Sequence, residues 1–177
     1  MQFSCTFAII KNEAMNPKDV AFRTTIKPED IDHVREIISS SGFFYDFEIP
    51  VAIELAEEGV REGEKSGYYF VFADLDGKAI AYTCYGHIAG TDAGYDLYWI
   101  ATHDALRGTG IGKLLLEKTE QFVRERGARY LIAETSMLDK YLPTRLFYEK
   151  CNYKNEAVIS DYYKPGDGKV IYVKRLA

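Results

Sequence analysis

Three glycines lie close together in the middle of the chain, and their spacing suits the binding of an anionic ligand. Gly108, Gly110 and Gly112 occupy every second position between the apolar segment 96–102 and the apolar run 114–116. Glycine lets the main chain approach a ligand closely and adopt dihedral angles that other residues avoid. The first amides of a helix have no partner within it and lie at the positive end of its dipole. The segment therefore predicts an anion site, most naturally for phosphate or diphosphate.

Two well-known glycine motifs do not fit this segment. A Walker loop requires Gly-x-x-x-x-Gly-Lys-Ser/Thr, but Arg107 occupies its first glycine position and a leucine follows Lys113. The dinucleotide motif requires Gly-x-Gly-x-x-Gly, whose last glycine would fall on Lys113 or Leu115. The pattern that fits is Arg-x-x-Gly-x-Gly over residues 107–112. A glycine-rich turn that only caps a helix is the alternative.

Length and composition indicate an ordinary globular protein. The chain has 177 residues, enough for one domain with a sizeable core, and is 47% hydrophobic and 28% charged. Its formal net charge of −5 argues against nucleic acid as the main partner, because binding phosphates requires a basic face. The acidic balance suits a cationic or amine substrate, although a charge that only aids solubility would look the same.

The cysteines predict a reducing compartment. Cys5, Cys84 and Cys151 are widely spaced and odd in number, so we expect neither a disulfide framework nor a metal site. The apolar stretch Phe7–Ile10 is too short for a signal-peptide core and has no basic region before it. No apolar run approaches the length of a membrane helix. We therefore expect a cytoplasmic protein that uses no metal and does not associate with a membrane.

Helix and strand patterns alternate on both sides of the glycines. Before them, we expect a strand at Phe22–Lys27, helices at Pro28–Gly42 and Ile49–Arg61, and strands at Tyr68–Ala73, Lys78–Ile88 and Tyr95–Thr102. After them, we expect a helix to Gly127, a strand at Tyr130–Thr135, a short helix at Pro143–Lys150, and strands at Glu156–Tyr163 and Val170–Val173. The strand–helix–strand spacing predicts a parallel crossover. Asp76–Gly77 is a hairpin turn signal, and Asn152 is expected to end the short helix in a left-handed conformation. Residues 1–20 are expected to form an N-terminal extension or an extra strand, and residues 21–177 the main domain.

The hydrophobic pattern also predicts which faces are buried. The first helix is expected to bury Ile31, Val34, Ile37 and Ile38, and the second helix to carry Val51, Leu55 and Val60 roughly on one face. The helix after the glycines is expected to bury Ile111, Leu114, Leu115, Phe122 and Val123, and to expose Lys113, Glu117, Glu120 and Arg124. Strict alternation in the strand Tyr95–Thr102 would place Tyr95, Leu97, Trp99 and Ala101 on one face, and Asp96, Tyr98, Ile100 and Thr102 on the other.

A second pattern, Phe-Tyr-Glu-Lys-Cys-Asn-Tyr, occupies residues 147–153 on the expected short helix. With the loop at 107–112 before it and a strand between them, the chain resembles the GNAT superfamily of N-acetyltransferases. The diphosphate loop of that family is Gln/Arg-x-x-Gly-x-Gly/Ala, and its late helix carries Phe-Tyr-Glu-Lys, usually followed by Gly-Phe. The segments 96–101, 143–148 and 163–167 also resemble a bacterial subgroup without a well-assigned substrate. The resemblance covers residues 21–177 and implies an α/β fold with a mixed central sheet flanked by helices.

The resemblance implies that acetyl-CoA is the co-substrate. Main-chain groups of the strand before the loop would meet the acyl-pantetheine arm; they belong to Ile100, Ala101 and Thr102. Loop amides would bind the diphosphate; these residues are Arg107, Gly108, Thr109, Gly110, Ile111, Gly112 and Lys113. The Arg107 side chain either adds charge or braces the loop. Tyr141 is a further candidate contact, although it stands where the family often has an asparagine that helps to hold the pantetheine.

Acetyl transfer to an amine requires a base for the amine and an acid for the leaving thiolate. A lysine-like amine has a pKa of about 10.4, so most of it is cationic at neutral pH. The resemblance makes Tyr148 the expected acid. Asp96 lies near the place of the catalytic glutamate in the histone-modifying branch, and it is the first candidate base, acting through a water. Glu134 on the next strand is the second.

Each of these candidates has a structural alternative. Tyr148 could be a core tyrosine with its hydroxyl bonded elsewhere, and Asp96 could be bonded to turn amides near Gly94. We expect His103, which follows the strand, to bond to a turn amide rather than to a ligand.

The expected function is N-acetylation of a primary amine of a small molecule or peptide, by direct attack in a ternary complex. The alternatives are a non-catalytic module that binds acyl-CoA and a transferase of longer acyl groups. The acceptor depends on residues 43–48, on the first two helices and on the hairpin near Pro165, where Asp46, Glu48 and Glu54 could attract a cation. Many relatives dimerise, and a homodimer is one expected arrangement.

Overall fold

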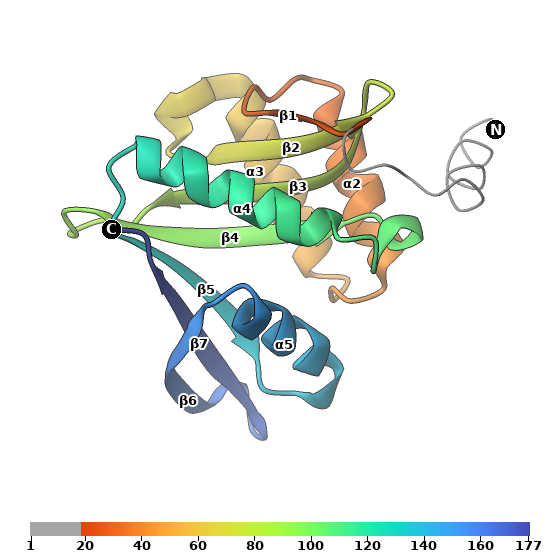
Figure 1. Cartoon of the computed structure of the whole chain (residues 1–177). Helices are drawn as coiled ribbons and strands as arrows, with labels where there is room; N and C mark the ends of the chain where they lie inside the picture. Colours follow the sequence, from red (N-terminus) through yellow and green to blue (C-terminus); the bar gives the residue numbers. More distant parts are fainter. Residues whose placement is uncertain (1–18) are drawn as a thin grey trace. The chain divides into compact units, whose positions relative to one another are not determined.

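The structure is a computed structural model that describes residues 19–177 (Figure 1). The extension or extra strand expected at residues 1–20 therefore falls almost entirely outside the described residues. The described chain forms two compact units. The first unit comprises residues 19–84 and 99–119, and the second comprises residues 85–98 and 120–177. Each unit is described by itself below.

Strands and helices alternate along the described chain, as predicted. The strands are β1 Ala21–Arg23, β2 Tyr69–Leu75, β3 Lys78–His87, β4 Gly94–Thr102, β5 Tyr130–Ser136, β6 Lys154–Lys164 and β7 Asp167–Arg175. The α-helices are α2 Asp30–Ser41, α3 Glu48–Glu62, α4 Ile111–Glu125 and α5 Leu142–Lys150. Hydrogen bonds join the strands in the order β1-β2-β3-β4-β5-β7-β6. β4 and β5 pair in parallel, whereas β7 pairs antiparallel with both β5 and β6. The predicted α/β class with a mixed sheet is therefore confirmed.

The core of the first unit forms where α2 and α3 pack on the strands. Val34, Ile37 and Ile38 of α2 are buried as predicted, whereas Ile31 is only partly buried, and Gly42 ends that helix with a left-handed φ of 61°. The other buried members of this cluster are Ala52, Ala56, Phe70, Phe72, Ala79, Tyr82, Cys84 and Ala101. An aliphatic helix stripe against aromatic strand residues therefore holds this unit together.

α3 buries a different face from the one predicted. Val51 is 47% exposed, and Leu55 and Val60 are only partly buried. The residues that α3 does bury are Ala52, Ile53, Ala56 and Gly59. A Cβ added to Gly59 would lie 2.6 Å from the Phe70 ring, so the small residues let the helix approach the strand closely. Apart from Ile53, the packed face of α3 therefore consists of small residues.

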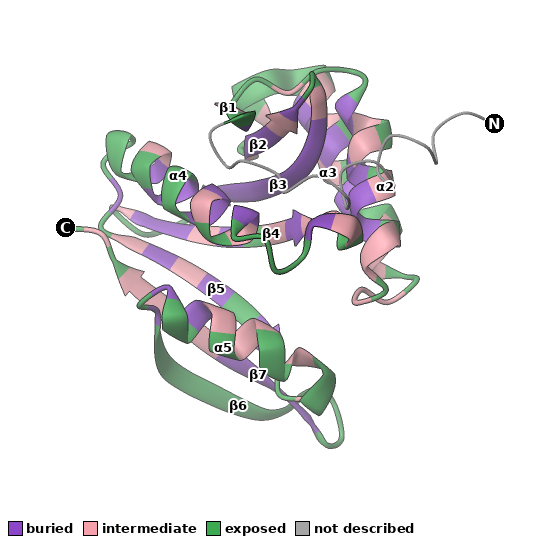
Figure 2. Cartoon of the chain, turned by 45° about the vertical axis from the view of Figure 1, so that its right-hand side comes forward, coloured by how far each residue is buried: buried purple, intermediate pink, exposed green. Residues whose placement is uncertain are grey.

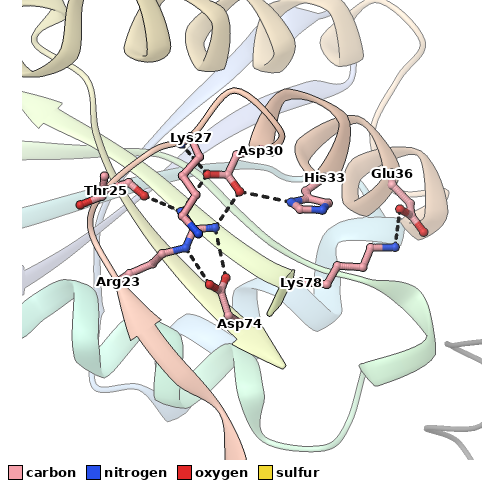
Figure 3. Close-up of polar contacts among 8 residues, drawn as sticks. All are labelled: Arg23, Thr25, Lys27, Asp30, His33, Glu36, Asp74 and Lys78. Atoms are coloured by element: carbon pink, nitrogen blue, oxygen red, sulfur yellow. Dashed lines mark hydrogen bonds and ion pairs between the residues drawn. The ribbon is translucent and has the colours of Figure 1, made fainter. Parts of the chain in front are cut away.

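A buried ionic cluster fixes the start of α2 (Figure 3). The Arg23 guanidinium donates to the Asp30 carboxylate at 2.6 and 2.7 Å and to the Asp74 carboxylate at 2.7 and 3.2 Å. The Lys27 amide donates to Asp30 at 2.7 Å, and His33 Nδ1 lies 3.2 Å from the same carboxylate. Burial alone would raise the pKa of Asp30, but these hydrogen bonds lower it overall.

The same cluster explains why β1 is shorter than the predicted strand Phe22–Lys27. Arg23 also donates to the Thr25 carbonyl, and the Lys27 amide is bonded to the Asp30 carboxylate. The main chain after Arg23 therefore forms hydrogen bonds with the ionic cluster. The pairing of β1 with β2 ends at Arg23.

Two neighbouring residues form the predicted hairpin turn between β2 and β3. Asp76 and Gly77 have φ values of 51° and 80°, as a turn with two left-handed residues requires. β3 is buried along most of its length, whereas β6 is exposed along all of it (Figure 2). Between residues 19 and 177, no helix is both long and apolar enough to cross a bilayer.

β4 contains one residue more than the facing part of β3. The Ile88 amide donates to the Gly94 carbonyl at 2.9 Å, and the His103 amide donates to the Ile80 carbonyl at 2.9 Å. Ile80 and Ile88 are eight positions apart in the sequence, but Gly94 and His103 are nine apart. Because a regular antiparallel ladder keeps equal spacing on both strands, β4 must carry a one-residue bulge.

The bulge breaks the strict alternation predicted for β4. Tyr95 packs against His87, with ring centroids 5.4 Å apart, whereas Trp99 packs on the α2–α3 core cluster that contains Ala101. Because a one-residue bulge shifts the alternation of side chains, the strict alternation predicted over the whole of β4 does not hold.

The second unit has its own core, formed by α5 with β5 and β7. Tyr148 of α5 packs on Tyr172 of β7, with ring centroids 5.4 Å apart. Asn152 follows α5 with a left-handed φ of 63°, as predicted. Glu120 of α4 was expected to face solvent but is only 3% exposed. This prediction fails because Lys174 of β7 lies 2.7 Å from its carboxylate and stabilises the buried charge.

Candidate coenzyme loop and catalytic side chains

The glycine loop, residues 107–112, connects β4 to α4 through a left-handed main-chain path. A short 3₁₀ turn at Asp104–Leu106 precedes it. Gly108 and Gly110 have φ values of 80° and 91°, and a Cβ added at either would meet no atom within 4 Å. These positions need glycine for its dihedral freedom and not for lack of space, because a β-carbon is strained at such φ values.

Several amides of this loop have no partner. Within residues 19–177, the amides of Gly108, Gly110, Ile111 and Gly112 donate no hydrogen bond. The Lys113 amide instead donates to the Gly110 carbonyl at 3.1 Å. The loop opens α4, a helix of 15 residues whose dipole places partial positive charge at this end. These donors fit an anionic group such as a diphosphate.

His103 fixes the start of the path into the loop. Its amide donates to the Ile80 carbonyl at 2.9 Å, and its Nδ1 accepts a hydrogen bond from the Ala105 amide at 3.2 Å. The prediction that His103 bonds to a turn amide is therefore confirmed. The Asp104 amide donates to Ser40 Oγ at 3.1 Å, which ties this turn to the end of α2. The loop thus begins from a main chain held by both β3 and α2.

Arg107 makes the contacts of a bracing residue. Its guanidinium lies 4.5 Å above the centre of the Phe43 ring and 3.4 Å from the Asp104 carboxylate. Cation–π contacts at exposed sites are worth about 0.5–1 kcal/mol. The contact between Arg107 and Phe43 could not be predicted from the sequence, because the two residues are distant along the chain and only the fold brings them together.

The aromatic loop, residues 43–47, lies between α2 and α3 in the same unit. Phe44 packs against Trp99 of β4, with ring centroids 5.1 Å apart. Tyr45 and Phe47 stack on each other at 5.3 Å with only 9° between their planes. The Tyr45 amide donates to the Glu48 carboxylate at 2.7 Å, which holds the end of the loop against the start of α3.

In the second unit, the Tyr148 side chain is enclosed by other aromatic rings. It is 4% exposed and lies 5.4 to 5.5 Å from the ring centres of Phe147, Tyr153 and Tyr172. Burial, with a smaller contribution from Cys151, raises the pKa of Tyr148 well above its ordinary value. The phenol therefore keeps its proton at neutral pH, which is the state that a proton donor needs. Its ring packing also agrees with the alternative of a core tyrosine.

The charged face of the second unit comprises Asp96, Glu134 and Lys169. Asp96 is paired in register with Ile132, and Glu134 follows two positions later on the same face of β5. The Lys169 ammonium on β7 lies 2.5 Å from the Glu134 carboxylate. It also lies 3.8 Å above the ring of Tyr162. Both candidate bases are thus brought to one face, together with a lysine that the sequence analysis missed.

The three charges influence one another. Burial, and then repulsion from Glu134, raise the pKa of Asp96, while Lys169 offsets part of this rise. Burial alone would lower the pKa of Lys169, but its bonds to Glu134 and Tyr162 raise it overall. The Gly94 amide donates to Thr91 Oγ1 at 3.1 Å, so the turn has another acceptor than Asp96. A carboxylate with a raised pKa is a stronger base once it is ionised.

Tyr141 ends a 3₁₀ turn at Asp139–Tyr141, directly before α5. Its amide donates to the Leu138 carbonyl at 2.9 Å, and the Lys140 ammonium lies 4.8 Å from its ring centre. Arg145 donates to the Ser136 and Leu138 carbonyls at 2.8 and 3.0 Å, which fixes the connection from β5 to α5. Within residues 19–177, no cluster of three or more His, Cys, Asp or Glu side chains is placed to hold a metal ion.

Comparisons with known proteins agree with this arrangement. The acetyltransferase (GNAT) family matches residues 31–153. None of the curated proteins compared with the chain matches it. A solved GNAT-family structure from Desulfovibrio desulfuricans is 44% identical, covers 89% of this chain and 99% of its own, and superposes with a TM-score of 0.87.

More distant solved structures share the fold. The ribosomal-protein-S18-alanine N-acetyltransferase of Escherichia coli is 17% identical, with a TM-score of 0.70 over 89% of this chain and 94% of its own. An aminoglycoside 6′-N-acetyltransferase complexed with coenzyme A is also 17% identical, with a TM-score of 0.70 over 89% of this chain and 97% of its own. At this level of identity the likeness concerns the fold alone.

Proposed function

Because the chain belongs to the GNAT family of acetyltransferases, we propose that this acyltransferase moves an acetyl group from acetyl-CoA to a primary amine of a small molecule or peptide. The amine attacks the thioester directly in a ternary complex, and the proposal includes no metal. The observation that carries it is that the amides of Gly108, Gly110, Ile111 and Gly112, at the positive end of α4, have no partner among residues 19–177. We assign the acetyltransferase domain to residues 21–177. A cytoplasmic location and a homodimer stay predictions from the sequence.

Main-chain groups hold the coenzyme in this proposal. Amides of residues 107–113 bind the diphosphate, and residues 100–102 contact the acyl-pantetheine arm. The β4–β5 register ends at Leu97, and the alternation set by the His103–Ile80 bond directs the amides of Ile100 and Thr102 away from β3. One such amide bonds the thioester oxygen, where an oxyanion donor contributes about 3 kcal/mol. Tyr141 is the proposed side-chain contact with the pantetheine.

Two proton transfers accompany the reaction. The amine nitrogen forms a bond to the acetyl carbon while the carbon–sulfur bond breaks, and the electron pair of that bond stays on sulfur. Tyr148 donates its proton to the thiolate and is afterwards reprotonated from solvent. Asp96 accepts the amine proton through a water, and its raised pKa supports this role. Glu134 is the second candidate, but the Lys169 ammonium already occupies its carboxylate.

Thiol release from acetyl-CoA in the presence of different amines tests this function. The set should include an aminoglycoside, a peptide with N-terminal alanine and simple primary amines, because proteins of this fold acetylate an aminoglycoside and an alanine of ribosomal protein S18. We expect amine-dependent thiol release and a product heavier by one acetyl group in mass spectrometry. Tight coenzyme binding without turnover of any amine would instead indicate the non-catalytic module. Faster turnover of butyryl-CoA than acetyl-CoA would indicate the longer-chain transferase.

A further inference from the structure

The aromatic loop contacts the same segments that we assign to the coenzyme. Phe44 packs on Trp99, which lies next to the proposed acyl-contacting residues 100–102. Phe43 lies beneath the Arg107 guanidinium at 4.5 Å, and Ser40 accepts a hydrogen bond from the Asp104 amide. All of these residues belong to the first unit. A molecule resting on the aromatic loop would therefore lie beside the strand that presents the acetyl group.

The outer end of this loop leaves apolar surface uncovered. Phe47 is 71% exposed, and its ring stacks nearly parallel on that of Tyr45. Val51, one helical turn later on α3, is 47% exposed. Exposed apolar groups that lie together commonly mark a binding surface. A flat pair of aromatic rings offers its face to another flat apolar group.

The charged residues of the aromatic loop and of the first three turns of α3 are acidic, and Arg61, which follows them on α3, is paired with Glu62. Residues 43–60 contain five acidic residues and no lysine or arginine. The acids are Asp46, Glu48, Glu54, Glu57 and Glu58. Arg107, the basic group that reaches this loop, lies over Phe43 and is paired with Asp104. The surface therefore favours a ligand that combines an apolar body with a positive charge, and aromatic faces also attract ammonium groups.

We propose that the aromatic loop is the acceptor-binding surface and that the acceptors are small primary amines carrying an aromatic group. The aromatic body stacks on the Tyr45–Phe47 pair, and the acidic surroundings attract the ammonium form before it loses its proton. This proposal rests on the proposed acetyl transfer and names its substrate class. Phe47 acts on acceptor affinity and not on the chemical step.

The single tryptophan of the chain provides a readout that does not depend on turnover. Trp99 packs directly against the aromatic loop through Phe44, so its emission should respond to a ligand there. Titration with 2-phenylethylamine in the presence of coenzyme A should change the emission and saturate. Propylamine, a primary amine without a ring, should bind at least about tenfold more weakly, as the loss of a buried apolar ring requires.

Kinetics and one variant complete the test. Phe47→Ser should raise KM for 2-phenylethylamine about tenfold, with unchanged kcat and unchanged KM for acetyl-CoA. Phe47→Leu should recover part of the affinity. Val158→Ser is the control, because Val158 on β6 is likewise an exposed apolar residue, 47% exposed, and lies outside the aromatic loop. Equal responses to the two amines, or wild-type KM in Phe47→Ser, would overturn the proposal. If propylamine is acetylated with the same kcat/KM as 2-phenylethylamine, only this proposal fails. A saturable change in emission without acetylation of any amine would contradict the proposed function instead.

Discussion

The glycine loop of the first unit and the charged face of the second unit offer different kinds of functional group: main-chain amides in the loop and side chains on the charged face. In the loop, the groups suited to a ligand are main-chain amides between Gly108 and Gly112, and the side chains serve mainly to shape the path. On the charged face, the groups are the side chains of Asp96, Glu134 and Lys169, whose charges act on one another. Substitutions should therefore act through dihedral strain in the first region and through lost functional groups in the second.

The largest effect should come from Tyr148→Phe, which removes the proposed acid without changing the ring. Loss of a general acid lowers kcat by about 100-fold or more. Coenzyme affinity should change little, because we propose that the glycine loop of the other unit binds the diphosphate. Steady-state kinetics and calorimetry measure the two quantities. Tyr153→Phe is the matched control, since Tyr153 is also buried and packs 5.5 Å from Tyr148. Equal kcat values in Tyr148→Phe and the wild type would remove Tyr148 from the mechanism.

Asp96→Asn should lower kcat at neutral pH by about 100-fold, the lower end of the range for a general base. It should also abolish the acidic limb of the pH–rate profile. Persistence of that limb in the variant would transfer the role to another group, with Glu134→Gln as the next substitution to measure.

The same variant makes a prediction about stability. Because the folded pKa of Asp96 is raised, its ionisation opposes folding, and the favourable contribution of the protonated form is lost as the pH rises through that pKa. Asp96→Asn should therefore melt at a higher temperature than the wild type at neutral pH. The difference should disappear below about pH 3.9, where aspartate is protonated in both states. Thermal melts across this range provide the measurement.

A moderate effect on coenzyme binding is expected from a glycine substitution in the loop, and a similar substitution elsewhere should lower stability only. Gly110→Ala places a β-carbon at φ 91°, and Gly127→Ala places one at φ 82°, with no atom within 4 Å in either case. Both should cost about 1–2 kcal/mol of folding free energy. Only Gly110→Ala should also weaken coenzyme A binding, by about tenfold, because it disturbs the amides around it. If both variants bound coenzyme A equally well, the distinction between the two regions would lose its basis.

The smallest expected effect is a shift in pH dependence. Lys169→Gln removes the positive charge that lowers the pKa of Asp96, so the acidic limb should move to higher pH. Lys169→Arg should restore it. Lys174→Gln is a close control, because Lys174 lies on the same strand and forms a comparable buried ion pair with Glu120. Lys174→Gln should lower stability and leave the acidic limb of the pH–rate profile in place. An equal shift of that limb in both variants would show a general effect of charge and contradict the specific role of Lys169.

The features that were predicted correctly from sequence depend on short stretches of chain. The Asp76–Gly77 turn, the glycine at the end of α2, the left-handed Asn152 and the His103 bond to a nearby amide all follow from neighbouring residues. Local steric preferences and local hydrogen bonds decide such features, so they are visible in the sequence.

The features that were missed depend on residues distant in sequence. Glu120 is buried because Lys174, 54 positions away, reaches its carboxylate. Glu134 meets Lys169 across 35 positions, through a strand pairing that no local pattern specifies. The β4 bulge appears only when the hydrogen bonds at both ends of the strand are compared. The candidate bases could be named from the sequence, but the charges acting on them could not.

The central claim is that main-chain amides of the glycine loop bind the diphosphate of coenzyme A. Calorimetry with coenzyme A and with pantetheine, which has the same thiol arm but lacks the diphosphate and the 3′-phosphoadenosine beyond it, tests it most directly. We predict micromolar binding of coenzyme A and at least about 100-fold weaker binding of pantetheine, as expected when several charge-assisted hydrogen bonds are lost. Equal affinity for the two ligands, or no heat on mixing with coenzyme A, would contradict the claim.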